Sequence, residues 1–137
     1  MKNISPHITY HEATMSQTAI RRGIENTPNE CELKNMGIVA NACFEPLREW
    51  YGKPLYINSF FRCEILNTEI RGQKNSQHIQ GRAIDISAGN KIENEKIFQW
   101  AKLNLKFDQL IDEFDFSWIH VSFDLGHNRN QIIHVKK

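Results

Sequence analysis

Cysteine is scarce in this chain, and its pattern excludes two common kinds of site. Among 137 residues there are three cysteines, Cys31, Cys43 and Cys63, an odd number without CxxC spacing. Such a set argues against a disulfide framework and against a zinc site built from thiolates. We therefore expect buried or incidental thiols.

Net charge is nearly absent as well. Lys and Arg together number 17 and Asp and Glu number 16. No long-range field of one sign would therefore hold the chain on nucleic acid or on an anionic membrane. We expect a monomer that binds neither, and whose partner is selected by a specific site.

Long hydrophobic runs are also missing. The opening residues MKNISPHITYHE contain no apolar run of signal-peptide length, and no stretch of about 18 apolar residues follows. We expect a protein that is made in the cytoplasm without a signal peptide. The length is near the commonest domain size, which predicts a single domain over residues 1–137.

Helix start signals occur twice near the beginning of the chain. Thr9 and Glu12 have the spacing of a capping box and predict a short helix that ends near Gly23. The stretch TPNE at 27–30 predicts a second start, with Pro28 at the first helical position.

A longer helix should follow this second start. Its apolar residues recur at steps of three and four: Leu33, Met36, Ala40, Cys43, Leu47 and Trp50. This period places them on one face of a helix that runs to about Tyr51 and stops at Gly52. We expect it to be the main core helix, with a bend at Pro46.

Beyond residue 54 the pattern changes to that of strands. Five segments qualify: LYINSFF (55–61), RAIDIS (82–87), FDQLIDEF (107–114), WIHVSF (118–123) and QIIHVK (131–136). A helix is expected from about Glu93 to Leu105, and residues 62–80 should form a long irregular connection with room for one helical turn. These elements predict an α+β fold in which helices pack on a mainly antiparallel sheet. Loops as long as 62–80 are usually functional in a small domain.

Two polar residues alternate with apolar ones on these strands. Asp85 and His120 each lie on the face opposite to their isoleucine and valine neighbours. If the two strands are neighbours, Asp85 and His120 can converge, and His78 can reach them from a loop that Gly81 allows to turn tightly.

Two imidazoles and one carboxylate with an open fourth position form the ligand set of a catalytic zinc ion. A histidine followed by an aspartate seven residues later also occurs in proteins without a metal. Composition and spacing therefore leave a metal-binding role and a structural role both open.

Longer segments of the chain resemble one family. INSFFRCEILN, NSQHIQGRAIDI, FDQLIDEF and WIHVSF, followed by the pair Asn128 and Arg129, are similar to segments of the M15 family of zinc peptidases. This family includes D-alanyl-D-alanine carboxypeptidases and phage endolysins. The likeness is strong to the short M15 proteins of phages and prophages, and it extends over nearly the whole chain. The combined signature Ser-x-His-x-x-Gly-x-Ala-x-Asp and Trp-x-His is specific.

The resemblance implies a metal site and a fold. His78, Asp85 and His120 match the zinc ligands of the family. The implied fold is the one shared with the signalling domain of hedgehog proteins.

The resemblance also implies substrate-binding residues. Arg62, in a Ser-x-x-Arg pattern with Ser59, matches the group that steadies the substrate carbonyl or carboxylate. Ser76 matches a serine that contacts substrate. From the residues alone, Arg62 could also be a surface ion-pair residue and Ser76 a turn residue.

The general base is where the sequence departs from the commonest family pattern. Many M15 enzymes have a glutamate three residues before the final histidine, but Ser117 occupies this position. Asp112, Glu113 and Asp115 are the nearby carboxylates. Strand alternation puts Glu113 and Asp115 on one face, and Asp115 should fall in the turn to the next strand. We predict that Glu113 is the catalytic base, with Asp115 as the alternative.

Together these features predict a zinc metallopeptidase that hydrolyses amide bonds in the peptide stems of bacterial peptidoglycan, with Zn²⁺ as cofactor. Carboxypeptidase and endopeptidase action are both open. The protein would act on the cell wall if released, as phage lysis proteins are. Two alternatives are a hedgehog-like binding module that keeps the metal site without turnover, and a structural phage protein that grips the cell wall. A carboxylate held near the metal would favour the enzyme.

Overall fold

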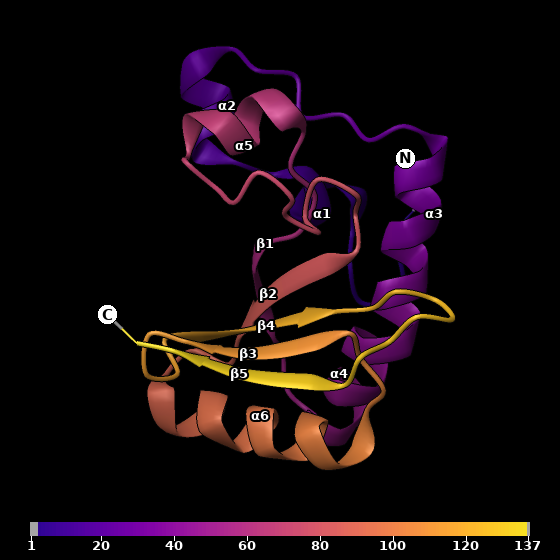
Figure 1. The fold of residues 1–137 in the computed structure, drawn as a ribbon, viewed down its shortest axis with the longest axis vertical. Helices are drawn as coiled ribbons and strands as arrows, with labels where there is room; N and C mark the ends of the chain where they lie inside the picture. The colour runs from indigo at the N-terminus through magenta and orange to yellow at the C-terminus, as the bar shows by residue number, and fades with distance from the viewer. Residues whose placement is uncertain (1–2, 137) are drawn as a thin grey trace.

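A mixed five-stranded sheet lies at the centre of the structure (Figure 1), a computed structural model that describes residues 3–136. Its strands are β1 (Tyr56–Ser59), β2 (Ala83–Ser87), β3 (Gln109–Glu113), β4 (Trp118–Ser122) and β5 (Gln131–Val135). They are arranged in the order β1-β2-β4-β3-β5. Helices pack against this sheet, which confirms the predicted α+β class.

Strand pairing is mainly antiparallel, as predicted. The pairs β1–β2, β2–β4 and β3–β4 are antiparallel, and only β3–β5 is parallel among the pairs described. Both sides of β4 are already occupied by β2 and β3, so the last strand can join only at an edge. After β4 the chain reverses direction, and β5 joins the sheet beside β3. Because β3 is antiparallel to β4, β5 is parallel to β3.

The first predicted helix is divided in two. α1 (Tyr10–Thr14) begins after Thr9, whose capping box is present as expected. The backbone then becomes extended, and the Ser16 side chain caps α2 (Gln17–Arg22). α2 ends at Gly23, as predicted.

The start of the main helix differs from the prediction. α3 (Glu30–Val39) begins after Asn29, so Pro28 lies outside the helix rather than at its first position. The Asn29 side chain accepts a hydrogen bond from the Glu32 N–H at 2.8 Å, and the Glu32 carboxylate accepts one from the Asn29 N–H at 2.8 Å. This reciprocal capping box overrides the start signal that Thr27 and Pro28 provide.

The middle of the main helix is π-helical. The segment η1 (Ala40–Phe44) joins α3 to α4 (Glu45–Tyr51), which has Pro46 in its first turn. Proline has no N–H to donate to the carbonyl four residues earlier, and the helix widens just ahead of it. α4 ends at Gly52, where φ is +72°, as predicted.

Two more helices follow along the chain. α5 (Glu64–Glu69) occupies part of the 62–80 connection, where one turn was expected. α6 (Lys91–Asn104) starts two residues before its predicted position because the Asn90 side chain caps it by accepting the Glu93 N–H at 2.9 Å.

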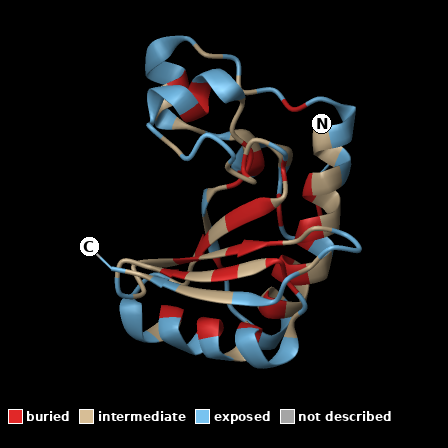
Figure 2. Ribbon diagram, in the orientation of Figure 1, coloured by how far each residue is buried: buried red, intermediate tan, exposed pale blue. Residues whose placement is uncertain are grey.

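One face of the sheet forms the core of the protein. The strand residues buried on it are Ile84, Ile86, Leu110, Ile119 and Val121. They pack against the α3–η1–α4 helix and α6, and Figure 2 shows buried segments where these helices face the sheet. The opposite face carries Asp85, His120 and Glu113, which are only partly buried. This face is therefore open to a ligand.

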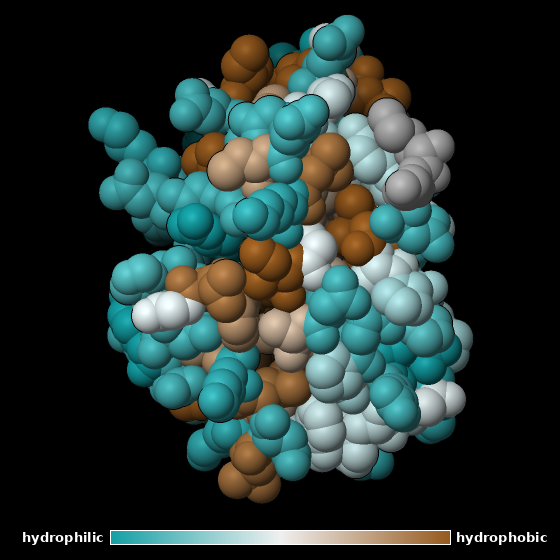
Figure 3. Space-filling view, turned by 90° about the vertical axis from the view of Figure 1, so that its right-hand side faces the viewer, coloured by the Kyte–Doolittle hydropathy of each residue, from teal (hydrophilic) through white to brown (hydrophobic). Residues whose placement is uncertain are grey.

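The outer surface is mostly polar. On the side shown in Figure 3, apolar side chains form a broken band between polar ones. Within residues 3–136 no helix combines the length and the apolar character needed to cross a bilayer.

Candidate metal centre and active site

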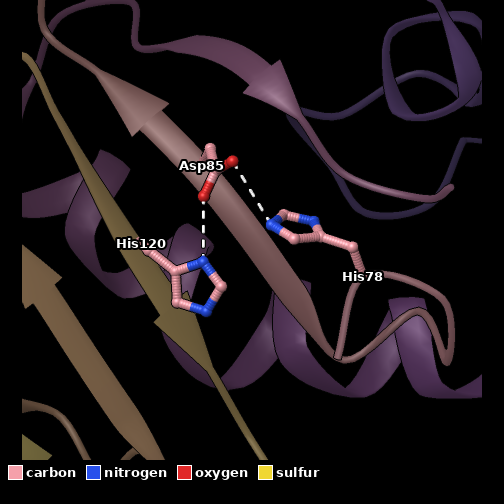
Figure 4. A group of neighbouring side chains, drawn as sticks. All are labelled: His78, Asp85 and His120. Atoms are coloured by element: carbon pink, nitrogen blue, oxygen red, sulfur yellow. Dashed lines mark hydrogen bonds and ion pairs between the residues drawn. The ribbon is translucent and has the colours of Figure 1, made fainter. Parts of the chain in front are cut away.

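Three side chains with metal-binding atoms converge on the open face of the sheet (Figure 4). Nε2 of His78 lies 3.2 Å from Oδ2 of Asp85, and Nδ1 of His120 lies 3.0 Å from Oδ1 of Asp85. One ligand atom from each residue lies within 4.8 Å of the other two. Two imidazoles and a carboxylate this close are the donor set of a zinc site with three protein ligands.

The fold explains why these residues meet. Asp85 and His120 are direct partners across β2 and β4. His78 comes from the turn before β2, where Gly81 has φ +73°. A Cβ on Gly81 would lie 2.7 Å from the carbonyl oxygen of Glu32 in α3. Only glycine therefore allows this turn to pack closely enough on the main helix to bring His78 to the strands.

A second contact selects the nitrogen that His78 offers. Its side chain is 2% exposed, and Nδ1–H donates a hydrogen bond to the carbonyl of Phe60 at 2.7 Å. Nε2, which faces Asp85, is then the nitrogen left to bind a metal ion when the ion displaces its proton. This arrangement is typical of a metal-binding histidine.

Asp85 is held in its ionised form. Burial alone would raise its pKa, but the charges and hydrogen bonds of His78 and His120 outweigh burial and lower the pKa of Asp85 well below its usual range. A carboxylate is the form that binds a cation. The chemistry of the donor set thus fits a zinc ion as well as its positions do.

Arg62 and Ser76 lie together beside this cluster. Nη2 of Arg62 donates a hydrogen bond to Oγ of Ser76 at 3.2 Å, and the same Oγ accepts the His78 N–H at 3.2 Å. Within residues 3–136 Arg62 forms no ion pair, and its buried Nε has no partner. Burial lowers the pKa of Arg62, and the charges of Asp85 and Glu113 oppose that shift. Arg62 is therefore a partly buried cation with an unused donor rather than a surface ion-pair residue.

Glu113 lies in the same groove as the three metal-binding residues. Burial is the main cause that raises the pKa of Glu113, and the charge of Asp85 adds to it. His120 and Arg62 act in the opposite direction. A glutamate with a raised pKa next to a metal-binding cluster suits proton transfer.

The other two carboxylates considered for this role lie elsewhere. Asp112 is 7% exposed, accepts the Phe116 N–H at 2.6 Å, and contacts Nδ1 of His134 at 3.0 Å. Asp115 is in the turn after β3, and its exposed side chain lies 3.6 Å from Nζ of Lys91. Neither lines the groove.

The groove has a volume of about 920 Å³. This value is at the upper end of the range of about 300–1,000 Å³ that is common for ligand pockets, so the groove has room for several residues of a peptide. All of the predicted site residues line it: Arg62, Ser76, His78, Asp85, Glu113 and His120.

Trp118 is a groove residue that the sequence reasoning did not select. It pairs with Glu113 across β3 and β4, and its buried Nε1 has no hydrogen-bond partner in the part of the chain described. Its alternation with His120 was a usable signal, because residues two apart on a strand share a face.

A buried carboxylate behind the groove was also missed. Asp108 accepts hydrogen bonds at 2.8 Å from Nε and from Nη2 of Arg129, and a further one at 2.8 Å from Nε2 of Gln77. The hydrogen bonds from Arg129 are the main cause that lowers the pKa of Asp108 to about 2. Gln77 precedes His78, so this network connects the loop of the metal site to the segment before β5. No local sequence pattern predicts this network, because Gln77, Asp108 and Arg129 are far apart in the chain.

The chain belongs to the M15 peptidase family. The family model described as Peptidase M15 matches residues 6–122, a range that contains every candidate site residue. A comparison with curated proteins gives no match. The resemblance to M15 peptidases is thus confirmed, and with it a peptidase whose His78, Asp85 and His120 can hold a metal. The likeness to phage-type members stays a prediction.

Proposed function

We propose that this M15 peptidase is a zinc-dependent enzyme that hydrolyses amide bonds in the peptide stems of bacterial peptidoglycan. The observation that carries the proposal is the placement of Glu113 and Arg62 in one groove with the His78, Asp85 and His120 cluster. A non-catalytic module would need the metal-binding residues but not a carboxylate of raised pKa beside them.

Amide hydrolysis in this scheme needs a bound metal ion and a residue that transfers a proton. Zinc, when bound, would lower the pKa of a water molecule at the site and polarise the scissile carbonyl. Glu113 takes a proton from the attacking water as its oxygen bonds to the carbonyl carbon. Glu113 then returns the proton to the amide nitrogen as the C–N bond breaks, which leaves a carboxylic acid and an amine.

Arg62 and Ser76 position the substrate in this scheme. The guanidinium donates to the carbonyl oxygen as negative charge develops on it, or to a substrate carboxylate nearby. Ser76 holds the guanidinium through its 3.2 Å contact and offers its own hydroxyl to the substrate. Gln77, through Asp108, supports the loop that carries Ser76.

Mass spectrometry of purified muropeptides provides the test. After incubation with the zinc-loaded protein, we expect loss of a stem amino acid or cleavage of a cross-link, and the mass change identifies the bond. Protein treated with a chelator and the Glu113→Gln variant are the matched controls. The first should leave the muropeptides intact, and the second should cleave them at least about a hundredfold more slowly.

The same experiment separates the proposal from its alternatives. Muropeptide binding without cleavage, dependent on metal, would indicate a hedgehog-like binding module. Binding to cell walls that persists after metal removal would indicate a structural wall-gripping protein. We further propose that the chain acts as a monomer and reaches the wall by release from the cytoplasm, as in phage lysis.

A further inference from the structure

One side of the groove is formed by the loop that follows α5. Arg71 and Lys74 belong to this loop, line the groove and are exposed. Neither forms an ion pair with any residue in 3–136. The loop thus brings two uncompensated positive charges to the groove.

The other cations of the groove lie near acidic groups. The charges of Asp85 and Glu113 act on Arg62, and Arg129 is bound to the buried Asp108. Arg82 lies 3.8 Å from Asp124. The groove is lined by five cations and three acids, so positive charge is in excess along it, and Arg71 and Lys74 contribute to that excess.

The loop that carries these two charges is held in one conformation by a buried asparagine. Asn67 is 4% exposed, its Nδ2 donates to the backbone carbonyl of Gln73 at 2.9 Å, and its own backbone carbonyl accepts the Gly72 N–H at 2.9 Å. A Cβ on Gly72 would lie 2.2 Å from Oδ1 of Asn67, so the loop packs directly on this side chain. Arg71 has φ +59°, a conformation that few residues other than glycine adopt. A loop built at this conformational cost keeps Arg71 and Lys74 at the side of the groove.

We propose that Arg71 and Lys74 determine substrate specificity by binding a carboxylate of the substrate that lies away from the bond that is cleaved. The inference rests on the proposed peptidase function and names the chemistry selected: a peptide with a free side carboxylate over its carboxamide. A guanidinium and an ammonium group both donate charge-assisted hydrogen bonds to a carboxylate, whereas a carboxamide of the same shape is neutral. The role differs from that of Arg62, which lies next to the metal-binding residues.

The test compares stem tetrapeptides in which one side carboxylate at a time is replaced by a carboxamide. Dissociation constants are measured by calorimetry with zinc-loaded Glu113→Gln protein, which should consume the peptides at least about a hundredfold more slowly than the wild type. The wild type is used to measure kcat/KM. We expect at least one carboxylate peptide to be preferred roughly tenfold over its carboxamide. The preference should decrease between ~0.05 and ~0.5 M salt because partly exposed charges are screened.

The variants assign the preference to this loop. Replacing both residues, Arg71→Ala with Lys74→Ala, should remove the preference, and Arg71→Lys should keep part of it. Gly72→Ala should also weaken it, because the cations remain but the loop must move. Lys102→Ala, an exposed charge removed from α6 outside the groove, is the control and should leave the preference unchanged.

Two results would overturn the inference. One is the absence of any carboxylate preference in the parent protein, including a failure of all the acidic peptides to bind. The other is a preference that survives in the double alanine variant. If the wild type cleaves none of the peptides, the proposed function fails, but the dissociation constants still decide whether this loop selects carboxylates.

Discussion

Asp112 and Glu113 are adjacent in β3, and their side chains lie on opposite faces of the sheet. Asp112 is buried and binds the Phe116 N–H and His134, whereas Glu113 lines the groove. By holding the turn after β3, Asp112 also helps to direct Asp115 toward Lys91 and away from the groove. One carboxylate of the three is thus left beside the metal-binding cluster, and it is the one with a raised pKa.

The Glu113→Gln variant should retain its zinc and lose catalysis. General acid–base help is worth about a hundredfold to ten-thousandfold in rate, so we expect kcat to fall by that factor. Steady-state kinetics on a muropeptide, together with metal analysis of the same sample, provides the measurement. Asp115→Asn is the matched control and should have normal turnover. An active Glu113→Gln protein with an inactive Asp115→Asn protein would transfer the role to Asp115.

Zinc content should depend on the three converging side chains. The purified protein should bind about one zinc ion per chain, and His78→Ala or His120→Ala should largely abolish binding. Elemental analysis after dialysis measures this directly. His127→Ala removes an exposed histidine outside the cluster and should leave the zinc content unchanged. Full zinc content in both ligand variants would show that the ion binds elsewhere.

Arg62→Lys should reduce activity although it keeps the positive charge. A lysine cannot reproduce the planar, two-pronged contact of a guanidinium, and the loss of an oxyanion donor costs roughly a hundredfold. We expect kcat/KM to fall by about this factor while zinc content and the unfolding transition are unchanged. Equal activity of the lysine variant would mean that Arg62 does not contact the reacting group.

Asp108 should stabilise the protein in a pH-dependent way. Its pKa is lowered from 3.8 to about 2 in the folded state, so its contribution is present above pH 3.8 and is lost as the pH falls toward 2. The shift corresponds to ~2 kcal/mol in the free energy of unfolding. Urea unfolding of zinc-free protein across this range measures it.

The Asp108→Asn variant isolates this contribution. It should be less stable than the wild type at neutral pH, and the difference should shrink as the wild type is acidified, because protonated Asp108 also lacks the charge. Asp115→Asn, which removes an exposed carboxylate, serves as the control. A difference between Asp108→Asn and wild type that stays constant from pH 7 to about pH 2 would contradict the assignment.

Local patterns in the sequence were sufficient to predict much of this protein. The step of three and four residues identified the main helix, and alternation identified the strands and the faces of Asp85 and His120. The Ser-x-His-x-x-Gly-x-Ala-x-Asp and Trp-x-His signature identified the family. These features depend on neighbours a few residues apart, so the backbone period alone reveals them.

Other features depended on how distant segments meet. Glu113 lines the groove and Asp115 does not because of the turn between them and the next strand. In this turn Phe114, Asp115 and Phe116 all have positive φ, which ends the strand alternation that had placed both acids on one face. β5 lies at the edge beside β3 because both sides of β4 are occupied, and its pairing with β3 is parallel.

The contacts that support the groove were likewise decided by the tertiary structure. Nδ2 of Asn67 bonds to the carbonyl of Gln73, and Gln77 and Arg129 bond to Asp108. No local period relates the groups in these bonds. In each case a buried polar group must find its hydrogen-bond partner wherever the packed chain places one. The sequence by itself therefore determined which residues could form the site. The sheet order and the packing of the loops decided which of them face the groove, because pairing across a sheet and burial of polar groups depend on the whole chain.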